Sequence, residues 1–204
     1  MKEMWNNRYA AKEYAYGTEP NVFFKEVIDK QQKTGKILFA AEGEGRNAIY
    51  AAKKGWKVTA FDSSEEGQKK ALQLAEKENV SIDYQAGDFL KLPLINQKFD
   101  VAVLIYAHFH PSILSEYHKK NADLINPEGL LILEGFSKGH LEKRKENPNV
   151  GGPDKLEMLF SKELIQNDFQ DFEIIQLEEV EIKLKEGLYH NGIGKVIRFI
   201  GKKI

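Results

Sequence analysis

The sequence predicts a single α/β domain whose sheet is doubly wound and mostly parallel. Short β-branched and apolar runs alternate with helical stretches, a glycine-containing loop follows the first of these runs, and two long strands end the chain as a hairpin. Alternating strands and helices give a parallel sheet that is covered by helices on both faces. With 204 residues the chain has the size of one domain, which we assign to 1–204.

The individual elements follow from the spacing of apolar residues and from the residues that interrupt it. Helical spacing predicts a first helix over 22–32, and Gly35 ends it. The run 99–105 is apolar on both faces, as central strands of parallel sheets are. Further strands are predicted at 36–41, 56–61, 81–85 and 130–134. Further helices are predicted at 46–54, 65–79, 111–125 and from Ser161 onward.

Several segments lie outside this alternation. Residues 1–20 are rich in aromatic side chains, and we interpret them as a lid over a bound cation rather than as a packed terminus or a surface that stacks on nucleic acid. The polar stretch 137–155 is predicted to be a mobile loop, and Pro93 marks another loop. Strands over 172–184 and 188–202 form the terminal hairpin, so at least one edge strand must run antiparallel to the rest.

Composition excludes several classes of function. Lysine and arginine together number 30 against 31 aspartates and glutamates, so no overall charge favours binding to nucleic acid or to an anionic membrane. Cysteine is absent, which excludes disulfides, thiolate metal sites and a cysteine nucleophile. The sequence contains no apolar run of about 18 residues and no apolar signal region. We therefore expect a cytoplasmic protein that is a monomer or a weak homodimer.

A glycine loop between the first strand and the next helix indicates a ligand site. Gly43-x-Gly45-x-x-Ala48 gives a tight turn at which a ligand can lie against bare backbone, and the third small residue lets the helix pack on the sheet. Asp62 ends the following strand about twenty residues later, where an acid can accept hydrogen bonds from both ribose hydroxyls. The pattern therefore predicts a ligand with a nucleoside end.

The charges of the loop narrow the choice of ligand. Dinucleotides place a pyrophosphate at such a loop and helix N-terminus. Here Glu42 and Glu44 flank Gly43, and their carboxylates would repel a pyrophosphate even if Arg46 offsets one of them. A ligand with an adenosine end, a cationic centre and no phosphate avoids this conflict. S-adenosylmethionine has these properties.

The motifs resemble a known family. The stretches 37–48 and 58–64 resemble the first two motifs of class I S-adenosylmethionine-dependent methyltransferases. Residues 87–89 resemble the part of that family that binds adenine, 99–106 its fourth motif, and 126–132 the turn before its fifth strand. The N-terminal patterns resemble the subgroup of tellurite-resistance and thiopurine-type methyltransferases. These patterns are Trp5-Asn-Asn-Arg-Tyr9 and Tyr14-x-Tyr16-Gly17-x-x-Pro20.

The resemblance implies a Rossmann-like methyltransferase fold with seven strands in the order 3-2-1-4-5-7-6, of which strand 7 is antiparallel. It implies S-adenosylmethionine as cofactor and methyl transfer to a small-molecule nucleophile: a thiol, a chalcogen oxyanion, or a nitrogen or oxygen acceptor. The family's acid and glycine are replaced by Phe39 and Ala41 here, and Glu42 is the candidate substitute for that acid. The expected cofactor-binding residues are Tyr16, Glu42, Gly43, Gly45, Arg46, Asn47, Asp62, Ser63, Asp88 and Phe89.

Three side chains after the fourth strand are candidates for catalysis: Tyr106, His108 and His110. Ligands of open α/β sheets bind at this end of the strands, and either histidine could serve as a general base or lie in the loop without a chemical role. The two histidines could also form a metal pair if Glu134 converged on them from the fifth strand. No carboxylate has convincing ligand spacing beside them, so we expect no metal.

Alternative functions have weaker support. Residues 135–139 match the Gly-x-Ser-x-Gly nucleophile elbow of hydrolases around Ser137, and Asp168 and His190 follow in hydrolase order. The elbow needs a packed helix after the serine, and 140–149 are too polar for a buried helix face. An oxidoreductase with the same glycine loop would usually have a second domain. A non-catalytic cofactor-binding sensor or partner subunit of the same fold is the remaining alternative.

Overall fold

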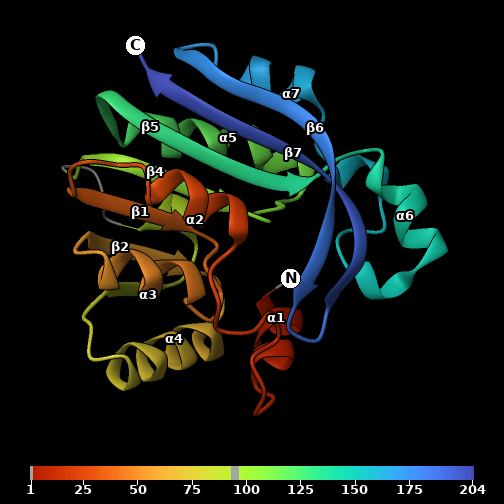
Figure 1. Ribbon diagram of the computed structural model, residues 1–204, viewed down its shortest axis with the longest axis horizontal. Helices are drawn as coiled ribbons and strands as arrows, with labels where there is room; N and C mark the ends of the chain where they lie inside the picture. Colours follow the sequence, from red (N-terminus) through yellow and green to blue (C-terminus); the bar gives the residue numbers. More distant parts are fainter. Residues whose placement is uncertain (1, 93–96) are drawn as a thin grey trace.

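A seven-stranded mixed sheet forms the centre of the protein (Figure 1). The structure, a computed structural model, describes residues 2–92 and 97–204, so the loop predicted around Pro93 lies outside the described residues. The strand order is β3-β2-β1-β4-β5-β7-β6, and β7 runs antiparallel to both of its neighbours. The predicted fold class and strand order are therefore confirmed.

The elements alternate along the chain as predicted. The strands are β1 (Lys36–Ala40), β2 (Lys57–Asp62), β3 (Asp83–Ala86), β4 (Phe99–Ile105), β5 (Ile125–Phe136), β6 (Phe172–Glu186) and β7 (His190–Lys203). The α-helices are α1 (Lys2–Tyr9), α2 (Val22–Ile28), α3 (Arg46–Lys53), α4 (Glu65–Lys77), α5 (Pro111–Asp123), α6 (His140–Glu146) and α7 (Lys162–Asp168). Short 3₁₀ turns are η1 (Phe89–Lys91), η2 (Pro148–Val150) and η3 (Leu156–Met158).

Successive residues of the central strands face opposite layers of helices, because side chains alternate across a sheet. In β1, Ile37 and Phe39 pack with α2 and α3, whereas Leu38 and Ala40 pack in the cluster that contains α5 and α7. Both faces of β1 and β4 are therefore buried, which explains why these strands are apolar apart from the exposed Lys36 and Asp100 at their amino ends. Among the described residues, no helix is long and apolar enough to cross a membrane.

Helix α6 lies within the stretch that was predicted to be a mobile loop. A single buried ring anchors this helix: His140 stacks on Phe136 with the ring centroids 4.0 Å apart. The ring nitrogens of His140 also hydrogen-bond to backbone atoms of Gly151 and Lys195. The prediction of a loop was wrong for 140–146 because one buried histidine replaces the apolar stripe that signals a packed helix.

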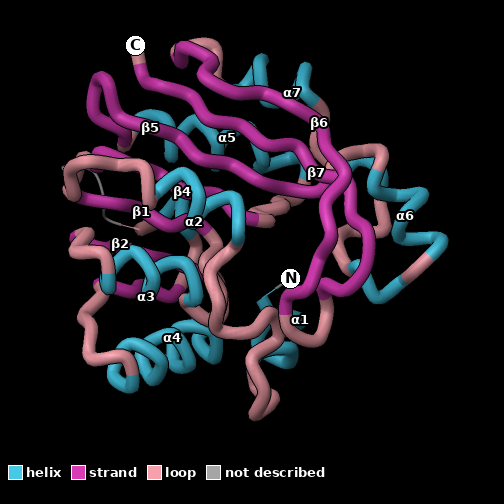
Figure 2. The backbone as a smooth tube through the Cα atoms, viewed as in Figure 1, coloured by secondary structure: helices cyan, strands magenta, loops and turns pink. Residues whose placement is uncertain are grey.

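The N-terminal segment packs over the carboxyl ends of the strands. Helix α1 lies against α4, and Asn6 accepts a hydrogen bond from the Ser64 hydroxyl at 2.6 Å. Buried Tyr9 places its hydroxyl against Gly43. Strands β6 and β7 continue beyond the rest of the sheet toward this segment (Figure 2), and Leu188 in their turn donates its N–H to the carbonyl of Ala15. The hairpin and α4 thus hold the N-terminal segment in place.

The contact between Tyr9 and Gly43 leads to a stability prediction. A Cβ atom on Gly43 would lie 2.6 Å from the Tyr9 hydroxyl, and the residue has φ of +61°. We expect Gly43→Ala to lower the free energy of unfolding by more than the roughly 1–2 kcal/mol that left-handed backbone costs alanine. In a Tyr9→Phe background, which removes the obstructing oxygen, the cost should fall. Urea denaturation of the four proteins measures this coupling.

Gly55 provides a matched control for this experiment. It also has a positive φ, of +89°, but the nearest atom to its added Cβ is 4.0 Å away. Gly55→Ala should therefore show the backbone cost alone, with no dependence on Tyr9. Equal costs for Gly43→Ala in both backgrounds would contradict the described packing of α1 on the glycine loop.

Candidate functional site

The carboxyl ends of β1, β2, β3, β4 and β5 meet at one edge of the sheet, where the strand order reverses between β1 and β4. Ligands of open α/β sheets bind at such a point. The residues directly after the two strands, Ala41 and Tyr106, have φ of +51° and +52°. Left-handed backbone is uncommon for residues other than glycine, and it is found often at functional sites. Both strands therefore end in abrupt turns at this edge.

The two acids of the glycine loop point in different directions. Oε1 of Glu42 accepts the N–H groups of Asn47 and Ala48, each at 2.8 Å, so its carboxylate lies at the N-terminus of α3. Glu44 points away from that position, is 5% exposed, and forms an ion pair with Lys70 at 2.6 Å. The position at which α3 would bind a phosphate is thus taken by the chain's own carboxylate. Burial raises the pKa of Glu42 to about 7.

Asp62 connects the first two strand-end loops. Its carboxylate accepts the N–H of Gly43 at 3.0 Å and the N–H of Ser64 at 2.8 Å, and only 5% of the residue is exposed. Burial raises its pKa even though these bonds, and others from Ser63, favour the charged form. Buried Tyr9 lies beside this carboxylate, with its hydroxyl against Gly43. A ligand on this face must share the space with Tyr9 or displace it.

Asp88 and Phe89 follow the end of β3. The Asp88 carboxylate caps η1 by accepting the N–H of Leu90, and it accepts the hydroxyl of Tyr117 at 2.8 Å. This hydroxyl lowers the pKa of Asp88. Phe89 is buried and stacks on Phe61 with centroids 4.0 Å apart. The side chain of Asp88 remains partly exposed, so it is accessible to a ligand at the β2 and β3 ends.

A buried polar network lies behind Tyr106. The Tyr106 hydroxyl donates to Oε1 of Glu134 at 3.1 Å, and Arg198 forms an ion pair with Oε2 of the same carboxylate at 2.7 Å. The Asn21 side chain donates to Glu134 and to Glu186. Burial raises the pKa of the Tyr106 hydroxyl well above its usual value. Tyr106 is thus a neutral donor with a fixed orientation, and sequence reasoning missed its partners.

The two candidate histidines after β4 are both engaged by hydrogen bonds within the protein. Nδ1 of His108 lies 2.8 Å from the Met158 carbonyl, and Nε2 accepts the N–H of Phe136 at 2.9 Å. Burial lowers the pKa of His108 to about 3, and neither ring nitrogen is left for a substrate proton. His110 is exposed and caps α5 through Ser112. Among the described residues, no cluster of three possible metal ligands exists.

A third histidine, His190, has the geometry that the other two lack. Its Nδ1 lies 2.9 Å from Oε2 of Glu186, which also pairs with Arg46 at 3.0 Å. Its ring lies 4.5 Å from Tyr16 and 4.6 Å from Tyr106, measured between centroids. Within residues 2–92 and 97–204, Nε2 has no hydrogen-bond partner. The i to i+4 spacing of an acid and a histidine across a hairpin turn is too common a pattern to have revealed this pair.

The alternative hydrolase site is not assembled. Helix α6 does follow Ser137, contrary to the sequence-based expectation, and its start contains one buried side chain. However, Asp168 pairs with His118 at 2.6 Å, and His190 pairs with Glu186. The Ser137 hydroxyl is buried and has no hydrogen-bond partner among the described residues. Asp168 and His190 are therefore paired with residues other than Ser137, and no triad forms.

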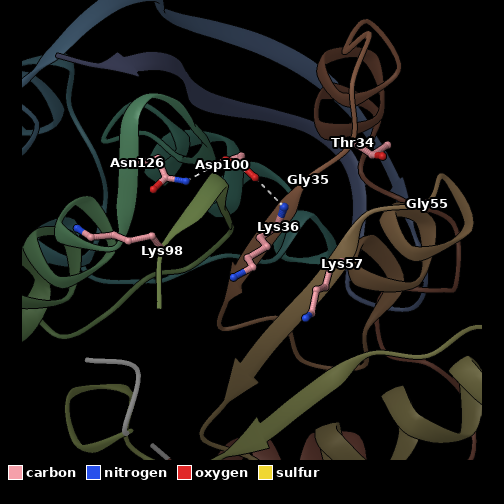
Figure 3. Close-up of a pocket in the computed structure, with 8 residues that line it drawn as sticks. All are labelled: Thr34, Gly35, Lys36, Gly55, Lys57, Lys98, Asp100 and Asn126. Carbon is pink, nitrogen blue, oxygen red and sulfur yellow. Dashed lines mark hydrogen bonds between the residues drawn. The ribbon is translucent and has the colours of Figure 1, made fainter. Parts of the chain in front are cut away.

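A separate cavity of about 540 Å³ lies at the opposite edge of the sheet (Figure 3). Lys36, Lys57, Lys98 and Asp100 line it, and they come from the amino ends of β1, β2 and β4. Oδ2 of Asp100 accepts the N–H of Lys36 at 2.8 Å. Because ligands of parallel sheets bind at the carboxyl ends, this cavity is not part of the candidate site.

Comparisons with known proteins agree with this geometry. Residues 37–129 match the family model described as a methyltransferase domain. An uncharacterised methyltransferase of Schizosaccharomyces pombe is 29% identical over 104 residues, which are 50% of this chain and 71% of the relative. The part of the chain that matches the family model includes the glycine loop, Asp62 and Asp88.

Two solved structures share the fold over the whole chain. One comes from work on the conversion of a disulfide bond into a thioacetal group during echinomycin biosynthesis. It has a TM-score of 0.81 and 17% identity to this chain, and the match covers 91% of its length. The other, TehB from Haemophilus influenzae, has a TM-score of 0.71 and 16% identity and is covered to 67%. The match over residues 37–129 and the shared fold together support a methyltransferase that uses S-adenosylmethionine as cofactor.

Proposed function

We propose that this methyltransferase acts on a small-molecule nucleophile and binds its cofactor across the loop at 42–45, between Asp62 and Asp88. The observation that carries the proposal is the position of the Glu42 carboxylate at the N-terminus of α3. A nucleotide phosphate would be repelled there, whereas the α-ammonium group of an adenosyl amino acid would be attracted. Glu42 thus substitutes for the acid that is missing at Phe39.

Other residues of the site would contact the remaining parts of the cofactor. Gly43 and Gly45 have left-handed backbone, which gives the loop its tight turn; Gly43 faces Tyr9 and Gly45 faces Ala71 of α4. Asp62 would accept the ribose hydroxyls, and Asp88 the adenine amino group. The bound cofactor supplies a methyl group on a sulfonium, which leaves as a neutral thioether. The aromatic faces of Tyr16 and Tyr106 suit a neighbouring cation.

The restriction to small acceptors follows from the closed edge of the sheet. Helix α1 covers the loop, and the hairpin turn holds the segment between α1 and α2 over the site through Ala15 and Leu188. A folded macromolecule could not present a side chain there while this segment is in place. The same enclosure excludes water, which favours alignment of the acceptor with the methyl group.

Calorimetric titration with S-adenosylhomocysteine tests the assignment of the cofactor site. We expect Asp62→Ala to weaken binding by about 1–3 kcal/mol, because charge-assisted hydrogen bonds are lost. Asp83→Ala, which removes an exposed acid on the neighbouring strand β3, is the matched control and should bind as the unchanged protein does. No saturable heat at millimolar ligand would contradict the proposal. Binding without turnover of any thiol, amine or hydroxyl acceptor would favour the non-catalytic sensor.

The raised pKa of Glu42 leads to a prediction about protons. The free protein holds this pKa at about 7, and an ammonium group beside the carboxylate favours the charged form, so binding should lower the pKa. S-adenosylhomocysteine should therefore release protons near neutral pH. The measured heat should then vary with the ionisation enthalpy of the buffer, and Glu42→Gln should abolish this dependence. An unchanged dependence in Glu42→Gln would place the ammonium group elsewhere.

His190 is the side chain that we assign to accept a proton from an oxygen or nitrogen acceptor. Glu186 orients its ring, and burial lowers its pKa, so the ring is neutral at pH 7. We expect His190→Gln to lower kcat by about 10²–10⁴-fold for such acceptors, with unchanged affinity for S-adenosylhomocysteine. The acid limb of the kcat profile, below the ordinary pKa of histidine, should disappear in this variant. Persistence of that limb would exclude His190 as the base.

A further inference from the structure

A second, smaller cavity adjoins the aromatic wall around His190. It measures about 160 Å³ and is lined by residues from α1, α6, the turn between β6 and β7, and the loop after α6. Arg8, Tyr16, Arg144 and Tyr189 are among its lining residues. An apolar cavity of about 150 Å³ holds one benzene molecule, so this space fits a group of about six non-hydrogen atoms.

Arg8 is held rigidly at this cavity. Its guanidinium lies 4.6 Å from the centroid of the Tyr189 ring and 4.9 Å from that of Trp5, and it donates to the Tyr16 hydroxyl at 2.8 Å. The guanidinium carbon thus lies over two aromatic rings. Hydrogen bonds from arginine are made at the edge of this plane, and that edge faces no carboxylate within ion-pair distance in the described part of the chain.

Arg144 is poorly satisfied by the protein itself. Its Nε atom is buried without a hydrogen-bond partner among the described residues. Its nearest carboxylate is that of Asp154, at 4.0 Å, and the Asp154 side chain is 68% exposed. No residue that lines the cavity is acidic. Two half-buried guanidinium groups thus lie at one small cavity, and the unpaired Nε of Arg144 is a donor that an anion could satisfy.

The cavity also lies next to the proposed reaction centre. Gly151 lines it, and a Cβ on Gly151 would lie 2.8 Å from Cδ2 of His190 and 2.5 Å from the Tyr189 carbonyl. Tyr16 lines the cavity too, and its ring centroid lies 4.5 Å from that of His190, so the cavity adjoins the Tyr16–His190–Tyr106 wall. A molecule held here by one end could direct its other end toward His190.

We propose that this cavity is the subsite for the methyl acceptor, and that the acceptor is a small molecule with an oxyanion group bound between Arg8 and Arg144. Arginine suits this role because its donors match the geometry of a carboxylate or another oxyanion. This inference rests on the proposed function, since it places the acceptor beside the methyl-transfer site. It adds the charge and the size of the acceptor, which the cofactor site does not define.

Three thiols of similar size test the charge preference. Mercaptoacetate, 2-mercaptoethanol and 2-mercaptoethylamine are anionic, neutral and cationic at neutral pH, and each is titrated into the protein saturated with S-adenosylhomocysteine, with ligand-observed NMR as the readout. Mercaptoacetate should bind at least tenfold more tightly than the other two. Equal affinities would overturn the proposal, as would the absence of binding by both mercaptoacetate and inorganic phosphate.

Single variants locate the binding. Arg144→Gln and Arg8→Gln should each weaken mercaptoacetate binding at least tenfold. Lys145→Gln, which removes a charge from the same helix in an exposed pair with Glu142, should not. Unchanged affinity in Arg144→Gln would overturn the proposal.

The affinity for S-adenosylhomocysteine separates this inference from the proposed function. It should be unchanged in Arg144→Gln, whereas Arg8 also holds the hydroxyl of Tyr16. If Arg144→Gln lost that affinity instead, the anion bound here would be the cofactor's own carboxylate, and the acceptor subsite would be overturned. If the unchanged protein failed to bind S-adenosylhomocysteine but still bound mercaptoacetate through Arg144, the proposed function would fail while the anion site remained.

Discussion

One buried carboxylate holds the ligand edge of this protein together. Asp62 accepts N–H groups from Gly43 and from Ser64, and so joins the loops after β1 and β2 into one rigid surface. A buried carboxylate without such donors would cost several kilocalories per mole, so the loops and the acid fix each other. The glycine loop keeps its left-handed turn, α3 and α4 start at defined positions, and α1 has a formed surface on which to pack. The rest of the site is arranged around this contact.

Enclosure of the site depends on segments that are distant in sequence. The hairpin of β6 and β7 continues past the sheet and contacts the chain between α1 and α2, while Glu44 and Lys70 hold the same segment from the other side. Most of the hydrogen bonds of this enclosure join loops, turns and α4 rather than strands of the sheet. Segments of this kind open at lower free energy than the core does. Exchange of ligands can therefore proceed without unfolding of the sheet.

The fold was predictable from sequence because it depends on local patterns. The apolar runs of β1 and β4, the alternation of strands with helices and the glycine turn indicate the parallel sheet, and the terminal hairpin indicates its antiparallel edge. The position of Asp62 also follows from the strand pattern. The opposite directions of Glu42 and Glu44 do not, because the backbone turn at Ala41 decides which side chain meets α3. Arg8, Arg144 and His190 converge from three separate regions, and no local pattern encodes such a meeting.

The carboxylate at the start of α3 has a consequence for selectivity inside a living cell. Adenine nucleotides are abundant there, and they share their nucleoside half with the methyl donor. A glycine loop with an unoccupied helix end would bind them and be inhibited. Glu42 already accepts the first free N–H groups of α3. A phosphate of ATP or of a similar metabolite would therefore meet a carboxylate there instead of free N–H donors. In the proposed binding mode, the methyl donor therefore needs no separate device to keep adenine nucleotides out of its site.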